Sequence, residues 1–512
     1  MNKRVLLAAL PLAFLIVFSL APLARLLAEG RGAVSAGLLS DAYLQWRIGW
    51  SFLQAALTCL LCLLIGLPIA WSFARFDFFG KPWLWRLLML PFVMPTLVAA
   101  MGVLALFGPQ GVFGLNLQDT PVLLLYGNLF FNLPLMIRAV GEGLERLPPS
   151  RLLAARTLGA SPWRVFWRVE WPALRPWAGS ACCLIFLYCF SGFGLALLLG
   201  GQRYATVEVE IYQLVAYELN LADAGALALL MLAATGALML LYAWLERRMA
   251  APMKVERAVA QAPAGWRQRA LLLASLALLL VFAGLPLLAV AARALAALGR
   301  LDWAVVWQED TRLALWNTCR FTLAATALAT ALGILQGVAA KGSLGLRAAA
   351  FLPLLVSPVC VAFGLLLLYP ALTASLGLLL AAYALLAWPF VARNLTQALE
   401  SLPVSLPAAA RTLGASPWRA FWRVSWPLAL PALRRGAAFA AATALGEFAV
   451  TLFLSRPEWL TLTTLVYQRL GRPGQENADL AVVLSGVLMM LSLLAFCVIE
   501  WPGSRQDRRK PC

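Results

Sequence analysis

The stretch AARTLGASPWR occupies residues 154–164 and recurs unchanged at residues 409–419. Eleven identical residues do not recur by chance within one chain, so the repeat marks a duplicated unit. The same offset of 255 residues pairs Pro134 with Pro389 and still holds at Tyr212 and Tyr467. The two halves are therefore direct repeats, which is typical of two subunits fused into one pseudo-twofold pair.

The composition is that of a membrane protein. Hydrophobic residues make up 62% of the 512 residues and charged residues only 12%, with a mean hydropathy of +0.82. Apolar runs of roughly 20 residues, the length that crosses about 30 Å of hydrocarbon, recur along the whole chain. We expect an all-α polytopic fold with about twelve transmembrane helices in two six-helix repeats. The expected spans lie near 5–28, 50–74, 84–107, 121–140, 176–199, 222–245, 270–297, 313–340, 346–369, 372–392, 432–454 and 480–501.

The distribution of charge predicts the topology. Lys and Arg gather in the loops near 75–86, 146–175, 247–269 and 411–435 and at both termini, whereas the opposite loops mix acidic and basic residues. Because cytoplasmic loops collect Lys and Arg, both termini and both repeated stretches are expected in the cytoplasm. The net charge of +18 is thus explained by topology, and no nucleic-acid partner is expected. The division expected is a first half at 1–245, a cytoplasmic linker at 246–269 and a second half at 270–512.

The repeated loop predicts two short helices. Ser150 is expected to cap a helix that begins at Arg151, and Gly159 suits the end of that helix. Ser161 then caps a second helix with a proline at its first position, and Pro172 is expected to stop it. The second helix carries aromatic residues on one face, which can lie at the membrane interface. These aromatic residues are Trp163, Phe166 and Trp167, with Trp418, Phe421 and Trp422 in the second copy.

The first of these two helices is suited to docking. Ala154, Ala155 and Gly159 carry almost no side chain, so a partner can approach the backbone closely. The alternative is that the loops merely cover the helix bundle, but the near-identity of the two copies argues against it. Two copies about a pseudo-twofold axis predict a symmetric dimer as the cytoplasmic partner.

With this loop the chain resembles the inner-membrane permeases of type I ABC importers. Their motif reads E-A-A, three residues, G, nine residues, I, one residue, L-P, and both copies match its spacing at 153–172 and 408–427. Leu153 and Ala408 replace the usual glutamate, so the ion pair made by that acid is in doubt. The resemblance implies coupling helices, within loops near 145–172 and 400–427, that dock into the ATPase. The residues implied are Ala154, Ala155, Arg156 and Gly159, with Ala409, Ala410, Arg411 and Gly414 in the second copy.

The resemblance also implies a function and partners. The chain would be a bacterial inner-membrane permease subunit served by an ATPase homodimer and a periplasmic substrate-binding protein, embedded in lipid and carrying a small-molecule cargo. The stretches at 108–115, 130–148 and 199–230 resemble most the fused permeases of thiamine importers. Ferric iron is the alternative cargo, because fused iron permeases share this plan. A secondary transporter driven by ions is a further alternative, since two parallel six-span repeats also suit that class.

No catalytic chemistry is expected of the chain itself. No G-x-x-x-x-G-K-[ST] loop is present, so ATP hydrolysis is expected in a separate chain. The chain contains no histidine, and its nine cysteines lie mostly inside apolar runs, so no metal or cofactor is expected. Glu447 is the clearest charge within a span; we interpret it as a structural or gating residue, with contact to a cationic cargo as the alternative.

The segment that follows the fifth span shows a helical pattern. Val207, Ile211, Leu214, Val215 and Leu219 recur at helical spacing. This pattern predicts an amphipathic helix on the periplasmic membrane surface, a candidate docking site for the binding protein. A connector packed on the bundle is the equally weighted alternative.

Overall fold

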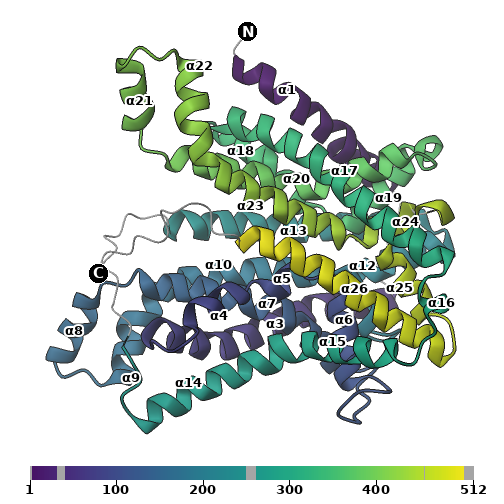
Figure 1. Cartoon of the computed structure of the whole chain (residues 1–512), viewed down its shortest axis with the longest axis horizontal. Coiled ribbons are helices and arrows are strands. Elements are labelled where there is room, and N and C mark those ends of the chain that lie inside the picture. The colour runs from purple at the N-terminus through teal and green to yellow at the C-terminus, as the bar shows by residue number, and fades with distance from the viewer. Residues whose placement is uncertain (1–2, 31–40, 250–260, 455, 501–512) are drawn as a thin grey trace.

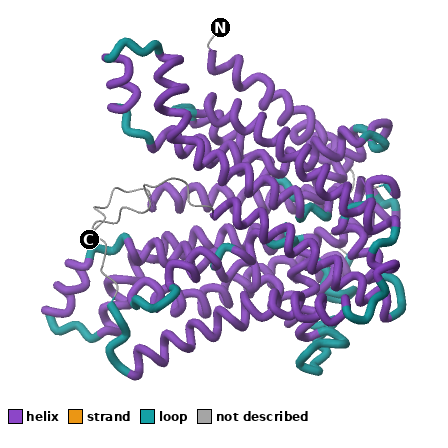
Figure 2. Tube along the Cα trace, viewed as in Figure 1, coloured by secondary structure: helices purple, strands orange, loops and turns teal. Residues whose placement is uncertain are grey.

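The computed structural model describes residues 3–30, 41–249, 261–454 and 456–500. Within these ranges the regular structure is helical, apart from one isolated parallel bridge between Phe76 and Gln261. Loops gather at the two ends of the helix bundle (Figure 2). Residues 250–260, which form much of the expected linker, lie outside the described residues.

The first half contains these elements, where η marks a short π turn: α1 (Lys3–Leu15), η1 (Ile16–Leu20), α2 (Ala21–Gly30), α3 (Ala42–Arg75), α4 (Lys81–Leu87), α5 (Leu90–Val93), α6 (Thr96–Phe107), α7 (Pro121–Glu145), α8 (Pro149–Thr157), α9 (Pro162–Val165), η2 (Phe166–Glu170), α10 (Trp171–Phe190), α11 (Phe193–Leu199), α12 (Val207–Gln213), η3 (Leu214–Glu218) and α13 (Leu221–Met249).

The second half repeats the order, with η5, η6 and η8 as 3-10 turns: α14 (Trp266–Leu279), η4 (Leu280–Gly284), α15 (Leu285–Leu298), α16 (Trp303–Val306), α17 (Glu309–Ala340), α18 (Leu344–Phe351), η5 (Leu352–Leu355), α19 (Pro358–Leu368), η6 (Pro370–Leu372), α20 (Leu376–Ser401), α21 (Ser405–Thr412), α22 (Pro417–Ala420), η7 (Phe421–Ser425), α23 (Trp426–Leu445), α24 (Ala449–Leu454), η8 (Pro457–Trp459), α25 (Leu462–Leu470) and α26 (Gln475–Glu500).

The described residues contain nine helices long and apolar enough to cross a membrane. A tenth span is the pair Lys81–Val93 and Thr96–Phe107, which bends by 101° at its break. The expected spans at 346–369 and 432–454 are also interrupted, before α19 and between α23 and α24. The all-α polytopic architecture in two repeats is therefore confirmed, whereas fewer than twelve of the spans are unbroken.

Two of these breaks lie at matching points of the halves. Met94 is extended before Pro95 at the start of α6, and Ser357 is extended before Pro358 at the start of α19. Proline donates no backbone N–H and disfavours helix in the residue before it, which explains why both spans break here. Pro91 in the four-residue helix α5 and Pro353 in η5 lie beside these breaks, whereas Pro389 lies inside the continuous helix α20.

The N-terminal helices of each half pack against the other half. Helix α2 packs against α19 of the second half, and α15 packs against α6 of the first. Both contacts need glycine, because a Cβ at Gly102 would lie 2.6 Å from the Pro286 carbonyl oxygen and one at Gly364 would lie 2.9 Å from that of Pro22. The halves are thus interlocked, and the chain division at 245 and 270 stays a prediction.

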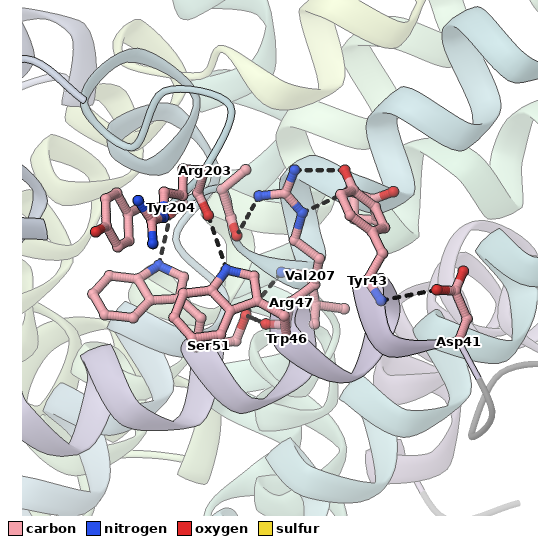
Figure 3. Close-up of polar contacts among 11 residues, drawn as sticks. Asp41, Tyr43, Trp46, Arg47, Ser51, Arg203, Tyr204 and Val207 are labelled. Carbon is pink, nitrogen blue, oxygen red and sulfur yellow. Dashed lines mark hydrogen bonds and ion pairs between the residues drawn. The ribbon is translucent and has the colours of Figure 1, made fainter. Parts of the chain in front are cut away.

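Helix α12 is not the surface helix that its spacing predicted. Every residue from Val207 to Tyr212 is buried, including two glutamates. The segment is tied to the start of α3: Val207 N–H donates to the Ser51 hydroxyl at 2.8 Å, and Trp46 Nε1 donates to the Arg203 carbonyl at 3.0 Å (Figure 3). These bonds satisfy backbone groups that burial would otherwise leave unpaired. The alternative, a connector packed on the bundle, is the one observed.

A buried ion pair completes this anchor. Arg47 Nε lies 3.1 Å from Glu210 Oε2, with both side chains 3% exposed, and the Tyr43 hydroxyl donates to the same carboxylate at 3.0 Å. Because a buried charge is costly unless it is paired, this network holds α12 to α3 in one arrangement. The second half makes the same junction with different residues: Leu462 N–H donates to the Thr318 hydroxyl at 2.9 Å.

Candidate transport site and coupling hairpins

The two copies of the repeated stretch form two helical hairpins, α8–α9 and α21–α22. Both lie at the same end of the molecule, one on each half (Figure 1). Gly159 and Gly414, at φ +76° and +83°, adopt the left-handed conformation that terminates each first helix, as predicted. The expected Ser150 cap is wrong: α8 begins at Pro149, and Arg151 N–H bonds to the carbonyl of Pro148.

The second helix of each hairpin starts as predicted but does not end as predicted. Ser161 and Ser416 accept hydrogen bonds from the backbone N–H groups of Arg164 and Arg419, at 3.4 and 3.3 Å. Pro172 does not stop the helix, which continues from Pro162 to Phe190. The π turn η2 precedes α10, so Pro172 falls in the first turn of α10, where its missing N–H costs little.

The tips of the hairpins are exposed and alike. Ala154, Arg156 and Gly159 are exposed and Ala155 is half-buried, and the pattern is the same at Ala409, Ala410, Arg411 and Gly414. Sequence reasoning missed the leucine before each glycine: Leu158 is 87% exposed and Leu413 is 89% exposed. Two apolar side chains so exposed beside small residues suit a groove on a separate protein. The docking role of these residues stays a prediction.

Each hairpin is stiffened by stacked rings. Trp163, Phe166, Trp167 and Trp171 contact one another with ring centroids 5.3 to 6.5 Å apart. The rings of the second copy repeat the arrangement. The predicted aromatic face therefore forms in both halves and continues to the fourth ring.

In the part of the chain that the structure describes, the first hairpin is followed by a partly buried ion pair that the second hairpin lacks. Glu170, which is 2% exposed, pairs with Arg75 and accepts a hydrogen bond of 3.0 Å from Trp71 Nε1. Its mate at the constant offset is Ser425, which is also buried. The first hairpin is thus fixed to the end of α3 by charge.

We expect Glu170→Ala to destabilise the chain by about 2 kcal/mol, between the values typical of exposed and buried ion pairs. The reason is that Arg75 and the Trp71 N–H both lose their acceptor. Thermal unfolding in nanodiscs measures the loss, and Ser425→Ala in the other half is the matched control. Equal losses in the two variants would contradict this role of the ion pair.

Between the halves lies a cavity of about 320 Å³. Its walls come from the broken spans, from α7 and α20, and from α10, α23 and the segments that follow them. The lining residues include seven aromatic rings and a single charged side chain, Glu447. The rings belong to Phe92, Phe131, Tyr188, Phe193, Phe390, Phe439 and Phe448. An apolar, ring-lined site with one carboxylate is suited to a flat organic molecule of positive charge.

Glu447 is fixed within this wall. Its Oε1 accepts the Val450 N–H at 2.9 Å, which caps α24, and its carbonyl oxygen accepts bonds from the hydroxyls of Thr451 and Thr463. These bonds favour the structural interpretation of Glu447, and its place in the cavity lining is where a cargo contact would occur. The mate of Glu447, Gly192, lines the same cavity without a side chain.

The hairpins, the repeat and the shared cavity define a two-half transport subunit, and the sequence comparisons agree. Residues 63–251 and 332–500 match the family described as "Binding-protein-dependent transport system inner membrane component". The chain belongs to this family. The ion-driven alternative is therefore set aside.

The relatives extend over nearly the whole chain. The thiamine transport system permease protein ThiP of Haemophilus influenzae is 28% identical over 530 residues, covering 98% of this chain and 96% of the relative. ThiP of Escherichia coli K12 is 30% identical over 497 residues, covering 90% and 89%. The molybdenum transport system permease protein ModB of Azotobacter vinelandii is 33% identical over 169 residues, covering 31% of this chain and 75% of the relative.

Proposed function

We propose that this chain is the permease subunit of an ATP-driven importer for thiamine or its phosphate esters. The observation that carries the proposal is the similarity to thiamine permeases along nearly the entire chain. The cavity supports it, because the thiazolium ring of thiamine is a flat cation and the lining offers rings and one carboxylate but no Lys or Arg. A transport subunit of this kind does no bond chemistry itself.

The partners proposed are a cytoplasmic ATPase homodimer and a periplasmic binding protein. The exposed tips at Ala154–Gly159 and Ala409–Gly414 would enter one groove on each ATPase subunit, with Arg156 and Arg411 beside them. Both termini of the chain would then be cytoplasmic. Two similar hairpins on one end of the molecule support a partner with twofold symmetry.

In this proposal the ATPase drives alternating access. ATP binding draws the two ATPase subunits together, and the hairpins move with them. Because each hairpin continues directly into a long helix, α10 or α23, the movement is transmitted as rotation of whole halves. The interlocked helices α2 and α15 would keep the halves joined during this rotation.

The test is ATP hydrolysis in proteoliposomes that contain the chain, its ATPase and its binding protein. Thiamine-loaded binding protein is expected to stimulate hydrolysis about tenfold over the unloaded protein, since a ligand shifts a conformational equilibrium by its differential affinity. Ferric ion replaces thiamine in the parallel arm. Stimulation by ferric ion and not by thiamine would overturn the cargo proposed here.

A further inference from the structure

The two halves meet in a symmetric row of aromatic rings. Phe193 at the start of α11 and Phe448 just before α24 are mates at the offset of 255, and their rings stack with centroids 5.8 Å apart and planes 29° apart. Behind them lie Tyr212 and Tyr467, which are also mates, at 5.5 and 5.4 Å from the respective phenylalanines. The pseudo-twofold axis therefore passes between Phe193 and Phe448.

This row closes one end of the cavity. Phe193 and Phe448 are lining residues, are 4% and 2% exposed, and leave no gap between their rings for a cargo to pass. The two tyrosines do not line the cavity and belong to α12 and α25, at the end of the molecule away from the hairpins (Figure 1). A cargo arriving from that end has to part the phenylalanine pair.

Both rings sit where movement of the halves separates them. Each belongs to a different half and follows a break in a helix, after Ser191–Gly192 in one half and Gly446–Glu447 in the other. The pair is held together by ring stacking, a weak contact that movement of the halves can break. A third aromatic ring inserted between Phe193 and Phe448 would replace the lost contact on both of its faces.

We infer that Phe193 and Phe448 are cargo-contacting gate residues, and that a flat aromatic cation enters the cavity by stacking between them. The inference rests on the proposed function for the charge and aromaticity of the cargo. It explains why phenylalanines, and not aliphatic residues, meet at the axis of a site that has no positively charged lining residue. Glu447, adjacent to Phe448, supplies the negative charge of the same wall.

The experiment is thiamine uptake into proteoliposomes by the double variant Phe193→Leu/Phe448→Leu, with its ATPase and binding protein. Leucine keeps the gate apolar and nearly filled, so the purified variant is expected to unfold at close to the wild-type temperature. Uptake of thiamine is expected to fall about tenfold, because both ring contacts with the cargo are lost. Phe193→Tyr, which keeps the ring, is expected to keep uptake.

The matched control is Phe52→Leu/Phe186→Leu, which removes another ring pair, 6.0 Å apart, whose members do not line the cavity. Uptake that falls equally in the control, or that is unchanged in the gate variant while wild type responds to thiamine, would overturn the inference. Wild type that shows no response to thiamine-loaded binding protein would instead overturn the proposed function, and the inference with it.

Discussion

Replacing Gly159 and Gly414 together by valine is expected to release the ATPase from the permease. Both glycines have positive φ, where a β-branched residue is strained by about 1–2 kcal/mol. A Cβ at either position meets nothing within 4 Å in this chain, so the fold itself tolerates the added volume. The added methyl groups would instead stand between the hairpin tips and the ATPase groove. We expect the ATPase recovered with the purified chain to fall at least about tenfold.

The control uses two other glycines of the same kind. Gly80 and Gly342 have φ of +83° and +72° and also meet nothing within 4 Å, but Gly80 precedes α4 and Gly342 follows α17, outside the hairpins. Gly80→Val/Gly342→Val therefore carries the same backbone strain without touching the proposed docking tips. Equal loss of the ATPase from both double variants would show that strain, and not docking, is responsible.

The parts of the hairpins that the sequence predicted correctly are those fixed by local chemistry. A glycine at a helix end and a Ser-Pro pair at a helix start each satisfy a backbone requirement within a few residues. Pro172 was misjudged because its effect depends on the π turn before it, which changes the hydrogen-bonding register of the helix. The exposure of Leu158 could not be predicted either, since apolar residues are usually buried and nothing local indicates otherwise.

Contacts between the halves could not be predicted from local sequence, because they join residues that lie far apart in the chain. The exchange of α2 and α15 depends on the close approach of Gly102 to Pro286 and of Gly364 to Pro22, pairs separated by more than 180 residues. The Phe193–Phe448 pair could have been found, because both members sit at one offset in the repeat. What the repeat does not reveal is that the axis runs between them.

The burial of α12 could not be decided from the sequence, because its apolar residues fit two arrangements. A helix with one apolar stripe can lie on a membrane or pack on a bundle, so the two alternatives carried equal weight. The structure accommodates Glu210 by pairing it with Arg47. Glu208 has no such partner: it is fully buried, and neither carboxylate oxygen has a hydrogen bond.

Glu208 gives the chain a stability that depends on pH. Burial raises the pKa of the Glu208 carboxyl from 4.5 to about 8; the nearby Ser357 hydroxyl lowers this pKa, and the charge of Glu447 raises it. Between these two values the folded chain keeps a proton that the unfolded chain has lost. The free energy of unfolding therefore falls as pH rises from about 4.5 to about 8 and is level above that range.

The variant Glu208→Gln is expected to remove this dependence, because an amide stays neutral at every pH. As pH rises from 5 to 9, the unfolding temperature of the wild type, measured in nanodiscs, should fall relative to that of the variant. The corresponding loss in the free energy of unfolding is up to about 5 kcal/mol. Glu208→Thr should behave like the amide, since its mate Thr463 is neutral and donates to the Glu447 carbonyl at 3.2 Å. If the unfolding temperatures of the wild type and both variants changed with pH in parallel, Glu208 would be ionised in the folded chain. A cation or water would then have to reach Glu208 past the closed Phe193–Phe448 gate.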